Sequence, residues 1–487
     1  MNEPAQLAKY KATGSVLLIS VTSFGLLQGL VLPILSIIKQ DLHTTQANAT
    51  WVLTAFLLSA SIATPILGRI GDQVGRKRLL VITLLALSLG CILAGIAHSI
   101  EILIVARVIQ GLGGAVVPLS FGIVRDVYPP ARVASGVGLL AAMAAAGAGA
   151  GIIIAGPIID QLNYHWLFWL LLVITSLAAI LAWRVIPESR ERTGGRIGIP
   201  AAVLLSTWLV ALLLALSKGA SWGWGSEKVI ALFGVALVTC TTWIIVELKS
   251  QEPLVDMQMM KLTAVWTNNV VAFLLGVGMF SVFTFLPEFV ETPTSTGYGF
   301  GASVIQAGLF LLPLSLSMFL VGIMAGRITS AIGSKSAVIL GLIVAGCGYT
   351  WLTIAHSHRW DIYVVNALLG GSFGLAYSAM SNLIVHAVPH SQTGVASGMN
   401  ANIRTIGGAI GAAVVSSILA SSVLRDGYPT EAQYKIAFAF LAISTVLAIV
   451  AAVFIPKGTT ESARSDRGPL LSNAELAILA SAPIVEE

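Results

Sequence analysis

Long stretches of apolar residues follow one another along almost the whole chain, separated by short polar segments. Each stretch has about the 20 residues that an α-helix needs to cross the hydrocarbon core of a bilayer. The pattern predicts an all-α, polytopic membrane protein with fourteen transmembrane helices at 14–38, 49–70, 79–98, 101–124, 135–160, 165–186, 198–217, 229–247, 266–290, 304–328, 336–356, 360–388, 393–423 and 435–455.

Composition supports this prediction. Of the 487 residues, 56% are hydrophobic and 10% are charged, whereas soluble domains carry about 25% charged residues. No aqueous fold could bury so much apolar surface. The cations are scattered over many short loops, so we expect no nucleic-acid partner. Three cysteines fall at wide spacing inside apolar stretches, which predicts packed thiols without a disulfide or metal role: Cys91, Cys240 and Cys347.

The 27 Lys and Arg residues concentrate in alternate loops. If the N-terminus lies inside, most of them fall in cytoplasmic segments, which predicts that both termini are cytoplasmic (N-in, C-in). The densest cluster is GRIGDQVGRKRLL at 68–80, between the second and third predicted helices. Its glycines allow a tight turn and close helix approach. Asp72 is placed there to pair with a cation or to cap a helix N-terminus.

An internal repeat divides the chain. Gly68-Arg69 recurs as Gly326-Arg327, and Ala134-Ser135-Gly136 recurs as Ala396-Ser397-Gly398, at a common offset of about 260 residues. We therefore predict two pseudo-symmetric six-helix bundles at 1–190 and 263–456. Two inserted transmembrane helices and their linkers then occupy 191–262, and 457–487 form a cytoplasmic tail.

The loop at 68–80 resembles the signature G-x-L-a-D-r-x-G-r-k-x-x-l of the major facilitator superfamily. Gly68, Asp72, Gly75, Arg76 and Lys77 match it, and Gln73 departs from it. The layout of six, two and six helices resembles the fourteen-spanner drug:proton antiporter branch of that superfamily, a multidrug efflux family. This resemblance implies a cytoplasmic gate in which Asp72 and Arg76 form a latch, accompanied by the remaining gate residues Gly68, Gly75, Lys77 and Arg327.

Two further stretches resemble motifs of this family. RVIQGLGGAVVPLS at 107–120 resembles R-x-x-q-G-x-x-a, which implies a role in coupling or cavity shape for Arg107, Gln110 and Gly111. A buried Arg in hydrocarbon must face a cavity or be paired, and backbone carbonyls alone could satisfy it. GAGAGIIIAGP at 147–157 resembles the antiporter motif G-x-x-x-G-P-x-x-G-G, although Ile152 stands at the motif's Pro. The implied helix-packing residues are Gly147, Gly151, Gly156 and Pro157.

The first helix departs from the family pattern, because Phe24 stands where the family has an Asp. No carboxylate lies deep in any predicted span. Proton coupling needs a titratable group with alternating access, and Glu288 is the best candidate, although it also fits a solvated helix end. Arg404 lies deep in the thirteenth helix. The further candidates for a substrate cavity are Gln28, Phe280, Phe283, Asn366, Tyr377 and Asn400.

These observations predict a secondary active transporter that exports lipophilic small molecules by proton-coupled alternating access. We expect no enzymatic activity and no cofactor, because the sequence has no P-loop, G-x-S-x-G or metal-ligand cluster. The expected partners are the substrate, protons and membrane lipid, and the expected form is a monomer in the cell membrane. A flippase for lipid or a lipid-linked precursor, an importer, and a non-transporting sensor or scaffold remain alternatives. Two buried Arg and no buried acid favour neutral or anionic lipophilic substrates over dications.

Overall fold

The computed structural model describes residues 3–31, 34, 37–38, 41–44, 46–188, 198–251, 253–389, 392–424, 426 and 428–456. The end of the predicted first helix and the predicted tail at 457–487 lie at least partly outside these ranges. Apart from one isolated bridge between Val423 and Pro429, the regular structure of the described residues is helical.

Each of the six spans predicted for the first half overlaps a helix of the structure, although the first of these helices has different ends. The first helix runs over Glu3–Leu30, so it begins and ends earlier than predicted. The fourth span is two α-helices joined by the 3₁₀ turn Leu112–Ala115 (η2), where Gly113 and Gly114 interrupt the regular turns. The elements are α1 (Glu3–Leu30), α3 (Gln46–Val74), α4 (Arg76–Gly95), α5 (Ile100–Gly111), η2, α6 (Val116–Val127), α7 (Pro130–Gln161) and α8 (His165–Val185).

The rest of the chain forms the helices predicted as the insertion and as the second half. These elements are α9 (Ile199–Trp222), α10 (Glu227–Lys249), α11 (Met257–Lys261), α12 (Thr263–Glu291), η3 (Thr294–Thr296), α13 (Val304–Ile332), α14 (Ser334–Ile354), α15 (Arg359–Ala387), α16 (Thr393–Ala420) and α17 (Glu431–Val453). Among the described residues, 13 helices are long and apolar enough to cross a membrane, and α7 carries the further apolar stretch Ser135–Gly151. The prediction of an all-α, polytopic membrane protein is confirmed.

The repeat in the sequence corresponds to matching contacts between the halves. By the repeat, α13 corresponds to α3 and α16 corresponds to α7. Helix α3 packs on α16, and in the matching contact α13 packs on α7. A Cβ built on Gly68 of α3 would lie 2.9 Å from the carbonyl oxygen of Gly394 in α16. A Cβ on Gly326 of α13 would lie 2.9 Å from Cβ of Ser135 in α7. Each copy of the Gly-Arg pair thus allows a helix of one half to approach the other half closely.

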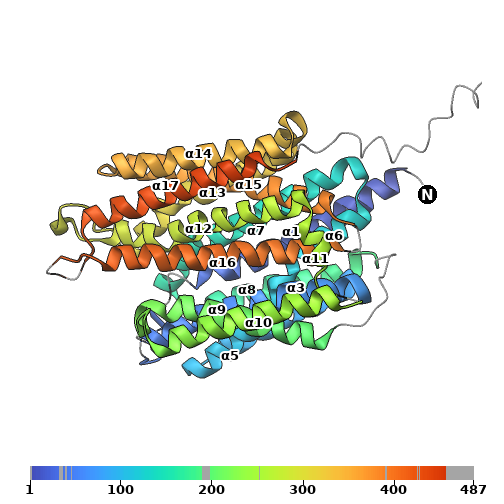
Figure 1. Ribbon diagram of the computed structural model, residues 1–487, viewed down its shortest axis with the longest axis horizontal. Helices are drawn as coiled ribbons and strands as arrows, with labels where there is room; N and C mark the ends of the chain where they lie inside the picture. The colour runs from blue at the N-terminus through green and yellow to red at the C-terminus, as the bar shows by residue number, and fades with distance from the viewer. Residues whose placement is uncertain are drawn as a thin grey trace, which may run out of the picture. The chain divides into compact units, whose positions relative to one another are not determined.

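The two inserted helices pack on each other and lie against one of these contacts. Helix α9 touches both α3 and α16, and Figure 1 shows α9 and α10 (green) beside them. Near the end of α9, Ser217 Oγ lies 3.2 Å from Thr54 Oγ1 of α3. At the other end of the pair, the buried carboxylate of Glu247 accepts hydrogen bonds from Trp243 Nε1 and the backbone N–H groups of Leu254 and Val255. That carboxylate holds the segment leading into the second half.

Glycines bring α12 and α16 into backbone contact. A Cβ on Gly276 of α12 would collide with the carbonyl oxygen of Arg404, and a Cβ on Gly407 of α16 would collide with that of Phe273. Because lipid tails are as apolar as the helices, close packing of this kind is what holds transmembrane helices together. It also fixes which face of α16 turns away from α12.

Gly407→Ala should therefore destabilise the protein, by about 1–3 kcal/mol, because a backbone oxygen cannot move aside cheaply. The measurement is the thermal unfolding midpoint of the detergent-purified protein. Gly234→Ala in α10 is the matched control, since its Cβ would meet nothing within 4 Å. Equal midpoints for the two variants would contradict this account of the packing.

Candidate functional site

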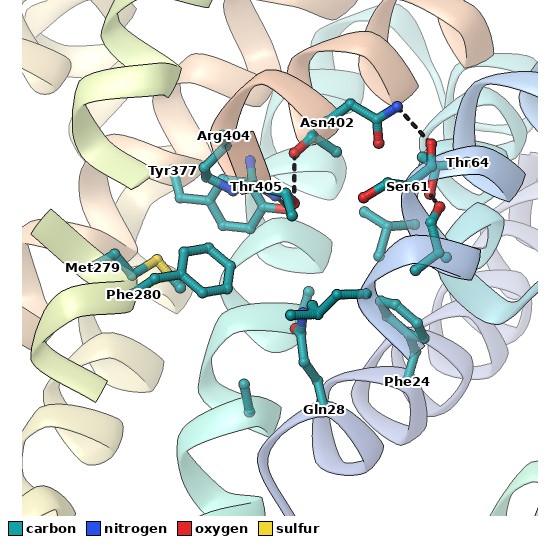
Figure 2. A pocket seen from close by; sticks show the side chains of 17 residues that line it. Phe24, Gln28, Ser61, Thr64, Met279, Phe280, Tyr377, Asn402, Arg404 and Thr405 are labelled. Carbon is teal, nitrogen blue, oxygen red and sulfur yellow. Dashed lines mark hydrogen bonds between the residues drawn. The ribbon is translucent and has the colours of Figure 1, made fainter. Parts of the chain in front are cut away.

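A cavity of about 80 Å³ lies between the two halves. The first half contributes residues from α1, α3, η2, α6 and α7, and the second half contributes residues from α12, α15 and α16. Figure 2 shows their side chains converging from both sides. The lining residues are Phe24, Gln28, Leu57, Ala60, Ser61, Thr64, Gly114, Val117, Ala144, Ala148, Met279, Phe280, Tyr377, Ala401, Asn402, Arg404 and Thr405.

Arg404 is the charged residue of this lining. It lies eleven residues after the start of α16 at Thr393, or about 16 Å along the helix at 1.5 Å per residue. Its guanidinium carbon lies 4.1 Å from the centroid of the Tyr377 ring, and its NH2 group donates a hydrogen bond of 3.1 Å to the Tyr377 hydroxyl. The sequence placed both residues near a cavity, and the structure brings them together at its wall (Figure 2).

The side of the cavity nearest the 68–80 loop is closed by contacts between α3 and α16. Asn402 Nδ2 donates a 2.6 Å hydrogen bond to the carbonyl oxygen of Ser61, as Figure 2 shows. About one turn further along, a Cβ on Gly398 would lie 3.1 Å from Cα of Pro65. Still closer to the loop, Gly68 of α3 meets Gly394 of α16. We call the end of the helices where this loop lies the gate end, which the charge pattern predicts to be cytoplasmic.

The predicted latch residues meet at the gate end. Arg76 NH2 lies 2.8 Å from Oδ1 of Asp72, and Arg76 NH1 lies 2.5 Å from Oδ1 of Asp126 in α6. The side chains of Asp72 and Arg76 are 0% and 6% exposed. Gly75 makes this geometry accessible, because it ends α3 and precedes α4 with a φ of 124°, in the region that favours glycine.

This charge cluster lies directly against the second half. A Cβ on Gly394 of α16 would lie 2.9 Å from Oδ2 of Asp72. Beside it, Arg125 NH1 of α6 donates a 2.6 Å hydrogen bond to Thr393 Oγ1, at the first residue of α16. The other two predicted gate residues lie apart from this contact: Lys77 is half-buried and Arg327 is exposed on α13. Asp126, Arg125 and Thr393 were not predicted. Asp126 could have been found as a carboxylate at a predicted helix end.

Arg107 is fully buried beside the cavity and does not line it. Its guanidinium lies 4.2 Å from the ring centroid of Phe56, its Nε donates to the carbonyl oxygen of Val52, and its NH1 donates to Gln110 Oε1 at 2.8 Å. Gly111 faces Ser59 so closely that a Cβ would collide with it. This group therefore ties α5 to α3, within the first half.

Several predicted cavity residues lie elsewhere. Phe283 and Asn366 are buried in the second half, where Asn366 Nδ2 donates to the carbonyl oxygen of Phe310. Asn400 Nδ2 donates to Asn269 Oδ1 instead of facing the cavity. Glu288 is an exposed residue near the end of α12, outside the lining. Gln28 and Phe280 do line the cavity.

The glycine motif of α7 packs against α1. A Cβ on Gly147 would lie 2.9 Å from the carbonyl oxygen of Thr22, and one on Gly151 would lie 2.5 Å from that of Leu26. Gly156 is half-buried, and Pro157 is an exposed residue in the last turns of α7, which continues to Gln161. The motif thus sets the distance between two helices that both line the cavity.

Comparisons with known proteins agree on the family. The Major Facilitator Superfamily profile matches residues 17–412. The chain is 28% identical over 375 residues to the multidrug transporter protein MdtP of Bacillus subtilis, covering 76% of this chain and 68% of that protein. It is 24% identical over 398 residues to the tetracenomycin C resistance and export protein of Streptomyces glaucescens, covering 81% and 73%.

Two solved structures share the fold. The human organic anion transporter MFSD10 matches with a TM-score of 0.65 and 15% identity, over 93% of this chain and 100% of that one. The proton:xylose symporter XylE matches with a TM-score of 0.65 and 14% identity, over 93% and 97%. At these identities the likeness concerns the arrangement of helices alone.

Arg76→Gln should destabilise the protein by about 3–5 kcal/mol, because it leaves two carboxylates facing each other without their buried cation. Arg78→Gln is the control. Arg78 Nε lies 3.4 Å from Glu188 Oε2, its side chain is 60% exposed, and exposed pairs contribute about 1 kcal/mol or less. Thermal unfolding of both variants in detergent provides the measurement. A wild-type midpoint for Arg76→Gln would show that the cluster carries no stability.

Proposed function

The chain belongs to the Major Facilitator Superfamily, and on that premise we propose that it exports lipophilic small molecules from the cell by proton-coupled alternating access. The observation that carries the proposal is the cavity between the two halves, which has apolar as well as polar lining residues and is closed at the gate end. Two relatives, a multidrug transporter and a tetracenomycin C resistance and export protein, support the export of small molecules. We place the protein in the cell membrane as a monomer.

The lining of the cavity suits a lipophilic compound. Phe24, Leu57, Val117, Met279 and Phe280 provide apolar contact surface, and an aromatic ring or a thioether adapts to ligands of different shape. Pockets of this composition are typical small-molecule sites.

The size of the cavity requires the halves to move. A volume of about 80 Å³ is far below the roughly 300–1,000 Å³ of pockets that hold drug-sized ligands. Substrate must therefore bind in another conformation, in which α3 and α16 stand further apart. We propose that the cluster of Asp72, Arg76 and Asp126 stabilises the closed gate end, and that its contact with α16 breaks when the gate opens.

We propose the proton gradient as the source of energy. Among the described residues that line the cavity, none is Asp or Glu, so a coupling carboxylate must act from outside it. Glu288 on α12 stays the candidate for this role. The same observation favours a second function on this scaffold, which is movement of a lipid or lipid-linked precursor between leaflets.

Proteoliposomes that hold the purified protein test both functions. With an imposed proton gradient, the neutral lipophile N-phenyl-1-naphthylamine should move against its own gradient, and protons should flow in the opposite direction. Glu288→Gln should keep substrate binding and abolish the proton flow. Substrate movement without proton flow would reject antiport. Redistribution of a fluorescent lipid between leaflets, with no movement of the lipophile, would favour the flippase.

A cross-link between the halves at the gate end should stop transport. A Cβ on Gly138 of α7 would lie 3.5 Å from Cβ of Ser378 in α15, which is within the Cβ separation of a disulfide, about 3.5–4.5 Å. In a Cys240→Ser, Cys347→Ser background, Gly138→Cys with Ser378→Cys should lose at least about 90% of transport on oxidation, because alternating access needs these halves to separate. Reduction should restore it.

The control pair lies inside one half. Gly341→Cys with Ala376→Cys joins α14 to α15, where a Cβ on Gly341 would lie 3.2 Å from Cβ of Ala376. Its oxidation should leave transport intact. Full transport by the oxidised Gly138/Ser378 pair would overturn alternating access at this seam.

A further inference from the structure

The position of Arg404 defines the charge of the ligand that the cavity can accept. Its guanidinium lies at the cavity wall, near the middle of α16, and its described hydrogen-bond partner is the neutral Tyr377 hydroxyl. A charged side chain at this depth persists only where it faces a cavity or a partner. A guanidinium has five N–H donors, and a single hydroxyl together with an aromatic face satisfies only part of them.

The surroundings of Arg404 leave its positive charge to be matched from inside the cavity. The polar residues that line the cavity with it are neutral: Gln28, Ser61, Thr64, Tyr377, Asn402 and Thr405. The amide of Asn402 is engaged with Ser61, and the hydroxyl of Thr405 donates to the carbonyl oxygen of Ala401. A second cation placed here would meet a like charge in a medium of low dielectric constant, where repulsion is weakly screened.

The stacking with Tyr377 also orients the guanidinium. A planar guanidinium that lies against the Tyr377 ring has a fixed orientation. The N–H groups along its edge can then donate two parallel hydrogen bonds to two oxygens of a carboxylate, sulfonate or phosphate. Phe280 and Met279 of α12 lie on the same side of the cavity as Arg404 and Tyr377, and Phe24 of α1 lies across it (Figure 2). The cavity thus combines one anion-binding point with a surface for a lipophilic body.

We propose that the substrates are amphiphiles that carry a single negatively charged group, and that Arg404, oriented by Tyr377, binds this group. The inference rests on the proposed function of export and names its substrate class. The same chemistry could come from a free organic anion or from an anionic lipid headgroup, and transport of the two can be measured separately.

The test compares two probes with one ring system. 8-Anilinonaphthalene-1-sulfonate carries a sulfonate, and N-phenyl-1-naphthylamine is the same skeleton without it. In proteoliposomes of the wild-type protein, the sulfonate should show the lower KM. Arg404→Gln should raise that KM about 10- to 100-fold, the loss expected for a hydrogen bond to a charged group. It should raise the KM of the neutral probe far less, because that probe has no anionic group to pair with the guanidinium. The lipophilic cation ethidium should be a poor substrate of the wild type.

Two further variants separate charge from geometry. Arg404→Lys keeps the charge and loses the planar fork, so it should recover only part of the affinity for the sulfonate. Arg184→Gln removes an exposed cation near the end of α8 and should change neither probe. A thermal unfolding midpoint of Arg404→Gln in detergent close to that of the wild type shows that this variant is folded.

A fluorescent phosphatidylglycerol, followed between leaflets, distinguishes the source of the anion. Movement of this lipid that depends on Arg404, without transport of the sulfonate, would assign the site to anionic lipid. If the wild type transports no probe, the proposed function fails. Calorimetric titration of the purified protein with the sulfonate then tests the substrate class separately. Loss of sulfonate binding in Arg404→Gln supports the proposed role of Arg404, and binding that is kept overturns that role. Equal KM values for anion and cation, unaffected by Arg404→Gln, would also overturn it.

Discussion

Close contact between helix backbones is the constraint on which this structure depends. In lipid, no hydrophobic force drives helices together, so packing and the few polar contacts between them must do so. Here glycines provide that packing within the halves, between α12 and α16, and across them, between α3 and α16. The contact across the halves, between α3 and α16, has a different consequence from the contact within a half. At Gly68 and Gly394 this contact is between two glycine backbones, which can separate and reform without repacking the interior of either half.

The charged cluster at the gate end adds specificity to this contact. Asp72 and Arg76 form a buried pair inside the first half, and the pair presents its carboxylate to Gly394 of the second half. A buried ion pair is weak evidence for net stability. Its value here is positional, because only a residue without a side chain fits at 394, and this restricts how α16 can approach.

Much of the fold could be predicted from the sequence, because span length and charge asymmetry follow from the bilayer itself. The repeat at an offset of about 260 residues anticipated the matched contacts of Gly68 and Gly326. The cavity was less predictable. Asn400 and Asn402 are two residues apart, which is about 200° around a helix, so only one could face the cavity, and hydropathy does not say which. The position of Asn366 was unpredictable for a similar reason. Its amide donates a hydrogen bond to a backbone carbonyl oxygen inside the second half, and no local sequence pattern indicates that partner.

The inserted helices break the symmetry that the repeat creates. Helix α9 lies against α3 and α16, the pair that forms one of the two seams between the halves, whereas the other seam is formed by α7 and α13. Lipid chains therefore meet two chemically different flanks. On the first flank α9 lies beside the joint between the halves and is in contact with both of its helices. A protein built from two similar copies thereby presents two different surfaces to the surrounding membrane.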